Sequence, residues 1–230
     1  MKHPNSNLIN IKAILSITLL SVVLQLKAQD EQVKNLAQFL FPEFAKSVVK
    51  MKAGKDIILM LNYNIVTEKM VFLQKGQVYD MLNQQNVDTI IMNSCRFIPA
   101  EKFFYEVLLE GPVNLYVQHK GKLEEPGKPV GYGGTSQVAS STYLTRIALD
   151  GNANNIFNMK LPDEFNVKAE DIFWISFNNN KNSFINERQF LKIFPGKESD
   201  IRKYIKQNHL KFENQEDVVK ITRFSYSLGK

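Results

Sequence analysis

The side chains of this 230-residue sequence that are suited to chemistry are few and far apart. Three histidines are present, and His3 lies in a leader segment, which leaves His119 and His209. A metal site usually draws on clustered His, Cys or carboxylate ligands, and no such cluster surrounds either histidine. We therefore predict no metal centre and no cofactor, with His119 at a surface strand end and His209 at a helix C-terminus.

Residues 150–155 begin like a calcium-binding loop, with oxygen-bearing side chains at alternate positions. The pattern then fails, because Asn155 stands where the loop requires glycine and Leu161 stands where it requires a bidentate glutamate. An Asp-Gly turn between two strands is the favoured interpretation.

Cys95 is the one cysteine of the chain, so no internal disulfide can form. Arg96 beside it could lower the pKa of the thiol and make it a nucleophile. Without a family signature around it, a small buried apolar role is the favoured interpretation. No Gly-x-Ser-x-Gly elbow is present, and a Ser-His-Asp triad stays open because its members need not be close in sequence.

A segment rich in Gly, Pro, Ser and Thr runs from Glu124 to Ser141. Its glycine-rich centre, residues 131–136, lacks the Gly-Lys-Ser/Thr ending of a phosphate-binding loop. The composition predicts a long irregular loop, mobile relative to the sheet. We treat Tyr132, Thr135 and Ser136 as a candidate ligand-binding loop, with a plain linker as the alternative.

The N-terminal segment has the pattern of a secretory signal peptide. Lys2 and Lys12 flank a polar stretch, and the apolar run of residues 13–24 is too short to span a bilayer. We place cleavage after Ala28 and expect the mature chain to begin at Gln29. No cysteine sits near the cut for lipid attachment, and no later segment is apolar for long enough to cross a membrane as a helix.

Cleavage would remove three lysines and no acidic residue, which lowers the formal charge from +6 by three, to +3. That mild excess and the predicted export make nucleic acid an unsuitable partner. The roughly 200 remaining residues are expected to form a single α+β domain over 29–230.

From residue 40 to residue 178 short period-two runs alternate with turn residues, which predicts an antiparallel, meandering sheet that could close as a sandwich or a barrel. We expect Leu59, Leu61, Phe72, Val107, Phe173 and Ile175 to face one shared core. The strand-like runs are 46–53, 57–63, 70–74, 77–82, 89–92, 103–109, 113–119, 143–147, 156–161 and 171–177.

Residues 185–228 change to a helical period. Asn186 and Asn214 are predicted N-caps, Pro195-Gly196 ends the first helix, and a second helix begins near Glu198. The basic residues of this segment could attract anionic glycans or lipid head groups. Acidic residues are interspersed with them, so a mixed solvated surface is the favoured interpretation.

The arrangement resembles the secreted proteins of unknown function that are abundant in Bacteroidota. The residues that carry the resemblance are 61–64 with 68–72, 88–90, Phe97, 104–108, 201–206 and 210–212. These motifs are structural in character and name no activity. The resemblance implies a cell-envelope location, for which the periplasm is favoured and the extracellular space is the alternative.

No convergent set of nucleophile, base and acid is visible in the sequence. We therefore expect a non-enzymatic structural or binding module, with an envelope protein or a glycan as its partner. The alternative is a hydrolase or transferase whose catalytic residues are dispersed along the chain.

Overall fold

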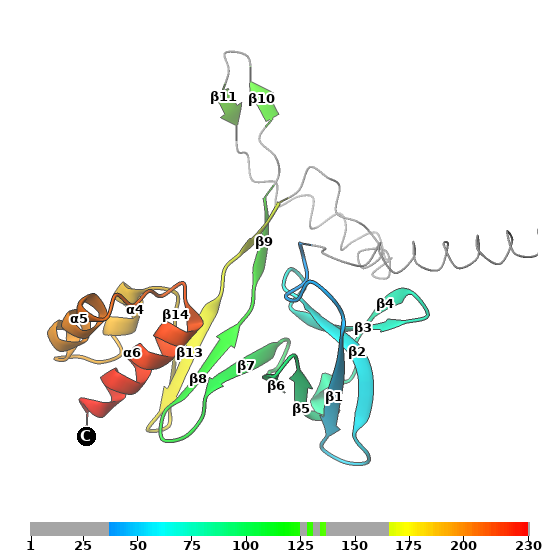
Figure 1. Ribbon diagram of the computed structural model, residues 1–230, viewed down its shortest axis with the longest axis horizontal. Helices are drawn as coiled ribbons and strands as arrows, with labels where there is room; N and C mark the ends of the chain where they lie inside the picture. The colour runs from blue at the N-terminus through cyan, green and yellow to red at the C-terminus, as the bar shows by residue number, and fades with distance from the viewer. Residues whose placement is uncertain (1–36, 125–127, 131–133, 137–165, 230) are drawn as a thin grey trace, which may run out of the picture.

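The structure, a computed structural model, describes residues 37–124, 128–130, 134–136 and 166–229 (Figure 1). The predicted leader, the runs predicted at 143–147 and 156–161, and the calcium-like segment 150–155 lie outside the described residues. No helix in the described part of the chain is long and apolar enough to cross a membrane.

Strands dominate this structure, and ten of them form one sheet in the order β14-β13-β8-β7-β6-β5-β1-β2-β3-β4. The strands are β1 (Ala45–Met51), β2 (Ile57–Asn64), β3 (Lys69–Gln74), β4 (Gln77–Asp80), β5 (Val87–Met92), β6 (Cys95–Pro99), β7 (Phe104–Leu109), β8 (Asn114–Gln118), β9 (Gly121–Glu124), β10 (Lys128–Val130), β11 (Gly134–Ser136), β12 (Asn166–Ala169), β13 (Ile172–Phe177) and β14 (Asn180–Phe184).

Strand β1 lies inside the sheet, so the chain meanders from β1 to β4 on one side and from β5 to β8 on the other. All pairings within this sheet are antiparallel, which confirms the predicted antiparallel α+β class. The described residues form neither a sandwich nor a barrel, because their large sheet is open and ends at β4 and β14.

Three hairpins of this sheet turn on two residues that both have positive φ. These pairs are Lys75-Gly76, Asn93-Ser94 and Asn178-Asn179, with φ values between 48° and 75°. Two consecutive positive φ angles define the type I′ turn, whose twist matches that of the flanking strands. The turn at Asn93-Ser94 creates β6 and the turn at Asn178-Asn179 creates β14, two strands that the sequence analysis did not anticipate.

The register places one row of side chains across the sheet on the face that we call the inner face. Its members are Val49, Ile90, Phe97, Glu106, Val117, Phe173 and Phe184. All but Glu106 are apolar, and all seven are buried. The row joins two hydrophobic clusters, and Glu106 lies between them.

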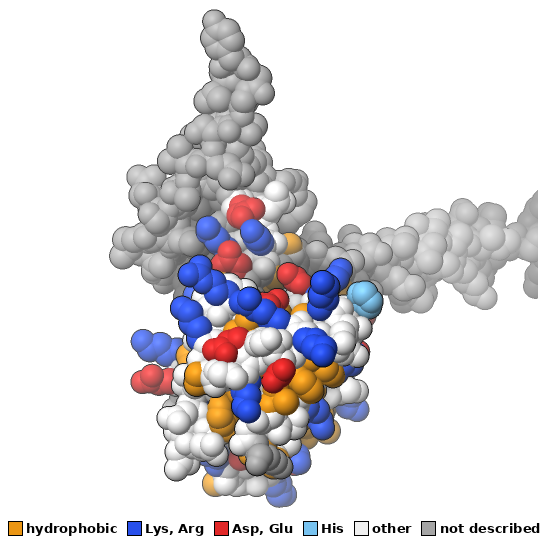
Figure 2. Space-filling view, turned by 90° about the vertical axis from the view of Figure 1, so that its left-hand side faces the viewer, with side chains coloured by type: hydrophobic (Ala, Val, Ile, Leu, Met, Phe, Trp, Pro, Cys, Tyr) orange, Lys and Arg blue, Asp and Glu red, His pale blue; other side chains and the backbone are white. Residues whose placement is uncertain are grey.

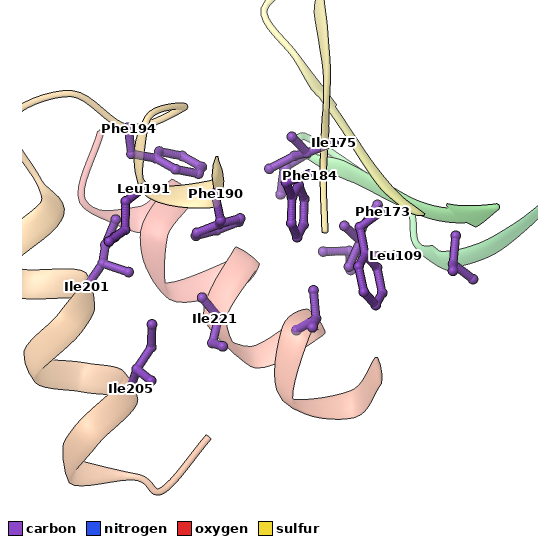
Figure 3. Packing of buried hydrophobic residues seen from close by; sticks show 14 residues of the cluster. Leu109, Phe173, Ile175, Phe184, Phe190, Leu191, Phe194, Ile201, Ile205 and Ile221 are labelled. Atoms are coloured by element: carbon purple, nitrogen blue, oxygen red, sulfur yellow. The ribbon is translucent and has the colours of Figure 1, made fainter. Parts of the chain in front are cut away.

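The first, which we call the strand cluster, consists of Val49, Leu61, Tyr63, Ile65, Met70, Val87, Ile90, Met92, Phe97 and Phe104. The second, the helix cluster, joins residues of the sheet and its loops to residues of the C-terminal helical segment. The sheet side consists of Leu109, Val113, Leu115, Val117, Phe173, Ile175 and Phe184. Figure 3 shows Phe184 of the sheet and Phe190 of the first helix in the space between the strands and the helices. Their ring centroids are 4.9 Å apart.

The predicted core is therefore divided. Leu61 belongs to the strand cluster, with Leu59 and Phe72 packed against it, whereas Phe173 and Ile175 belong to the helix cluster. The prediction for Val107 is wrong: its cross-strand partner is Tyr116, on the opposite, outer face.

The helices are α4 (Glu187–Leu191), α5 (Glu198–Gln207) and α6 (Gln215–Ser227), grouped beside β13 and β14 in Figure 1. Both predicted N-caps are confirmed, since Asn186 accepts a hydrogen bond from the Gln189 amide and Asn214 accepts one from the Asp217 amide. Each cap satisfies an amide that the first turn of a helix leaves unpaired. Ile201 and Ile205 are buried in the helix cluster, as the period of the second helix predicts.

Strands β9 and β12 continue β8 and β13 beyond the sheet as a two-stranded arm (Figure 1). At the junction of β8 and β9 the Gly121 amide donates to the Ile65 carbonyl over 2.7 Å. The turn between β2 and β3 therefore touches the far half of the sheet. This hydrogen bond links the end of β2 to the end of β8, two residues after His119.

Segment 37–44 runs beside the end of β2, where Phe39 forms a bridge with Asn64, and its Leu40 and Phe41 pack against the strand cluster. Its Phe39 side chain lies instead on the outer face. Phe39 packs there on Val71 and Val78, and the Asn62 side chain bonds the backbone of residues 41 and 43. Over β7, β8 and β13 the outer face instead presents a hollow, described below.

Candidate functional site

His119 follows β8 and lies on the inner face, with 3% of its surface exposed. Its Nε2 is 2.6 Å from Glu106 Oε2 and its Nδ1 is 3.0 Å from Asp171 Oδ1. The prediction of a surface strand end is therefore wrong. Residues 52 positions apart along the chain meet here because β13 pairs with β8.

The two carboxylates keep this buried ring charged. Burial alone would lower the pKa of His119, but the hydrogen bonds to Asp171 and Glu106 outweigh it and raise the pKa to about 9. At neutral pH His119 is an imidazolium whose two N–H groups donate to the two carboxylates.

We call His119, Glu106 and Asp171 the His119 cluster, and residues of other elements hold it in place. The Gln215 amide of α6 donates to Asp171 Oδ2 over 3.3 Å, and the Tyr63 ring meets the His119 ring edge to face at 6.3 Å. Burial and the negative charge of Glu68 raise the pKa of Tyr63, so its phenol stays neutral. The cluster thus connects β2, β7, β8, β13 and α6.

Cys95 lies against Glu106 on the same face. Burial raises the pKa of the thiol to about 12, and the hydrogen bond to Glu106 and its charge add to the effect. Arg96 does not oppose it, because its guanidinium pairs with Glu110 over 2.8 Å. Cys95 is a neutral thiol, which agrees with the small apolar role and not with a nucleophile.

This arrangement suits structure better than acid–base chemistry. A general base needs a free nitrogen within reach of a substrate proton, and both nitrogens of His119 are engaged with carboxylates. Among the described residues, no three His, Cys, Asp or Glu side chains are placed to hold a metal ion.

The outer face carries a different set of side chains over β7, β8 and β13. Tyr105, Tyr116 and Trp174 form an aromatic platform, with the Tyr105 ring centroid 5.5 Å from that of Tyr116 and 5.8 Å from that of Trp174. The ammonium of Lys181 in β14 lies over the platform, 4.0 Å from the Tyr105 centroid.

An open hollow of about 350 Å³ adjoins this platform. Residues 98–101 form one wall, and Tyr105, Tyr116, Ser176 and Lys181 form the rest. The volume lies at the lower end of the range of about 300–1,000 Å³ that small-molecule sites occupy. Aromatic walls with a few polar groups are also typical of such sites.

Hydrogen bonds fix the orientation of the platform. The Trp174 indole donates to Gln118 Oε1 over 3.1 Å, and the Gln118 amide donates in turn to Glu68 Oε2. Lys120 also lies 3.5 Å from Glu68. The turn between β2 and β3 therefore supports both faces of the sheet at this point, and Trp174 is held by groups outside the hollow.

The sequence-based candidates lie elsewhere. Thr135 and Ser136 belong to β11, whose backbone pairs with that of β10, so two paired strands stand in the segment for which an irregular loop was expected. Tyr132 lies outside the described residues. His209 is exposed just after α5, with φ of 52°, in the helix C-terminal position predicted for it.

The sequence contains a signal for the aromatic platform that the strand pattern alone does not reveal as a site. Tyr105, Tyr116 and Trp174 occupy the outward positions of three predicted strands, where alternation leads one to expect polar residues.

The helical side of the molecule carries mixed charge. Figure 2 shows Lys and Arg side chains there interspersed with Asp and Glu. Arg202 pairs with Glu187 over 3.5 Å and Lys220 with Asp217 over 3.1 Å. Local pairing of this kind makes a solvated surface a sufficient account of the basic residues.

Comparison with protein-family models, with curated proteins and with solved structures finds no match to this chain.

Proposed function

We propose that this protein is an exported, non-enzymatic binding module of the cell envelope whose ligand occupies the hollow beside the aromatic platform. The observation that carries the proposal is the convergence of Tyr105, Tyr116 and Trp174 from three neighbouring strands beside an open hollow. The signal-peptide pattern of residues 1–28 supports export.

The platform has the properties of a prepared binding surface. Its rings stand on paired strands, and the bond from Trp174 to Gln118 holds the indole in place. Tyr105 is buried, whereas Tyr116 and Trp174 are half-buried and can contact a ligand. A rigid aromatic side chain loses little conformational entropy on binding, because it has only two side-chain torsions. Sites on strands are also more sharply positioned than sites on loops.

The states of the His119 cluster and of Cys95 support the non-enzymatic part of the proposal. His119, the most promising acid–base residue, has no free nitrogen, and the thiol of Cys95 has a raised pKa. No described set of side chains favours the alternative of a hydrolase or transferase.

The chain contains one tryptophan, so binding can be followed directly. We expect saturable changes in Trp174 emission when the mature chain, residues 29–230, is titrated with a panel of neutral and acidic oligosaccharides of four to six sugars. Tyr116→Ala should weaken that binding about tenfold or more, the loss expected of a truncated aromatic anchor.

Tyr204→Ala is the matched control, because Tyr204 stacks on Phe224 in the helical segment, away from the platform. A panel in which no oligosaccharide changes the emission, or equal binding by the Tyr116→Ala variant, would argue against the proposed site. Fractionation of the native host should recover the protein outside the cytoplasm with Gln29 as its first residue; recovery with Met1 intact would contradict export.

A further inference from the structure

Lys181 is placed unlike the other cations of the outer face. Its Nζ lies 4.0 Å from the ring centroid of Tyr105, and 5.3 Å and 5.6 Å from those of Trp174 and Tyr116. Cation–π attraction of this geometry holds the ammonium over the rings.

Among the described residues, Lys181 contacts the three rings and pairs with no anion. The neighbouring cations differ in this respect. Arg96 pairs with Glu110 over 2.8 Å, and Lys120 lies 3.5 Å from Glu68. The rings thus orient the Lys181 charge at the border of the hollow without neutralising it.

We infer that the hollow binds an oligosaccharide that carries a carboxylate, with a sugar ring against Tyr116, the half-buried platform ring that lines the hollow, and the carboxylate on Lys181. The inference rests on the proposed function and names its ligand class. A sugar ring has a flat face of C–H groups that packs on an aromatic ring, and an anion paired with the ammonium makes a strong charge-assisted hydrogen bond.

The rest of the hollow suits the hydroxyl groups of a sugar. Glu101 and Ser176 lie on its walls, and their oxygens can accept hydrogen bonds from hydroxyl donors. A small anion such as free phosphate would make no use of the rings on the walls of the hollow.

A peptide with acidic side chains fits less well. Peptides commonly bind to sheets by adding a strand at a free edge, where the backbone groups are unpaired. The walls of the hollow also include β14, the edge strand that carries Lys181, but a strand added at that free edge would lie on the far side of β14 from Tyr116. The other strands beneath the hollow, β7, β8 and β13, already have a neighbour on both sides. Their backbone groups are therefore committed to the sheet.

Hexagalacturonate and its fully methyl-esterified form provide a direct test, because they share the sugar rings and differ in charge. We expect the mature chain to bind the acid at least about tenfold more tightly than the ester, measured by Trp174 emission and by calorimetry. Added salt should reduce the difference, since it screens the ion pair.

Two variants assign the difference to Lys181. Lys181→Met keeps the length of the side chain and should bind both forms with the weaker affinity, whereas Lys181→Arg should keep the preference for the acid. Lys181 is exposed, so neither change should impair folding, and circular dichroism checks this.

The outcomes separate the two proposals. Equal binding of acid and ester, or an unchanged preference in Lys181→Met, would overturn the carboxylate inference while leaving the binding function in place. Equal binding of hexaglutamate would overturn the assignment to a sugar. Failure to bind either form, together with failure to bind any neutral oligosaccharide, would overturn the proposed function itself.

Discussion

His119 shows how a buried charge is accommodated at the level of single residues. An unpaired ion in the protein interior costs several kcal/mol, whereas here two carboxylates neutralise the imidazolium and accept both of its protons. Removing one partner from such a group leaves an uncompensated buried charge, so we expect the stability of the protein to depend on pH and on substitution at this site.

The raised pKa of His119 makes stability depend on pH in a defined window. Its folded value of about 9 lies above the ordinary 6.5 of the unfolded chain, so the stabilisation is complete below about pH 6.5 and is lost as the pH rises through about 9. We expect the free energy of unfolding to fall by about 2 to 3 kcal/mol between about pH 6 and pH 9.

Denaturant unfolding at several pH values measures this loss. His119→Gln removes the titrating group and should flatten the profile in that window. The phenol of Tyr63 titrates above this window in both states, whereas the thiol of Cys95, whose ordinary pKa in the unfolded chain is about 8.5, adds a smaller loss at the upper end of the window that His119→Gln should keep. An identical slope in His119→Gln would show that another group is responsible.

Cys95 provides a second prediction for a single residue. The thiolate is the form that reacts with iodoacetamide, and a pKa raised to about 12 leaves very little thiolate at pH 8. Alkylation of the folded protein, followed by mass spectrometry, should be at least about a hundredfold slower than alkylation of the same protein in guanidinium chloride. Comparable rates would contradict a protected, neutral thiol.

At the level of elements, a close contact joins the β2–β3 turn to the β8–β9 junction, two segments that are distant in the strand order of the sheet. The Gly121 amide bonds the Ile65 carbonyl, and Gly121 has no room for a side chain. A Cβ placed there would lie 2.7 Å from Ile65 Cγ1 and 3.0 Å from Val167 Cγ1. Glycine is needed at this position for close approach and not for its backbone angles.

Gly121→Ala should therefore destabilise the protein by about 1 to 3 kcal/mol, the usual cost of overpacking. Gly229→Ala is the matched control, since the nearest atom to its Cβ would be the Tyr226 carbonyl oxygen at 3.6 Å. Denaturant unfolding compares the two variants.

The partner of the clash can be identified with a second change. Ile65→Ala removes the Cγ1 atom, so the double variant should lose at least about 1 kcal/mol less than the sum of the two single losses. Strict additivity would mean that Ile65 does not oppose the new methyl group.

At the scale of the whole molecule, two hydrophobic clusters share one sheet and one inner-face row. Leu61 is fully buried in the strand cluster, while Trp174 stands on the outer face behind the helix cluster. The shared strands and the His119 cluster join the two parts, which supports the expectation that residues 29–230 unfold as one unit.

Leu61→Ala tests that expectation. The substitution should cost about 2 to 5 kcal/mol, the range for large-to-small changes in a core. In a single cooperative transition, Trp174 emission and far-ultraviolet circular dichroism should shift together to the same lower midpoint. A Trp174 midpoint that stays in place while the circular dichroism shifts would show two separately unfolding parts.

The sequence by itself determined the elements whose signals are local. Strand alternation, the Lys75-Gly76 turn and the caps at Asn186 and Asn214 all depend on neighbouring residues, and each of these predictions is confirmed. The same local signals missed β6 and β14, because Asn93-Ser94 and Asn178-Asn179 make type I′ turns without the usual glycine.

Only the tertiary structure decided which polar side chains meet. His119 and Asp171 are 52 residues apart, and nothing in their surroundings along the chain identifies them as partners. Tyr105, Tyr116, Trp174 and Lys181 converge because β7, β8, β13 and β14 are neighbours in the sheet. Strand order and register are set by the burial of the whole inner face, a sum over distant residues that no local pattern contains.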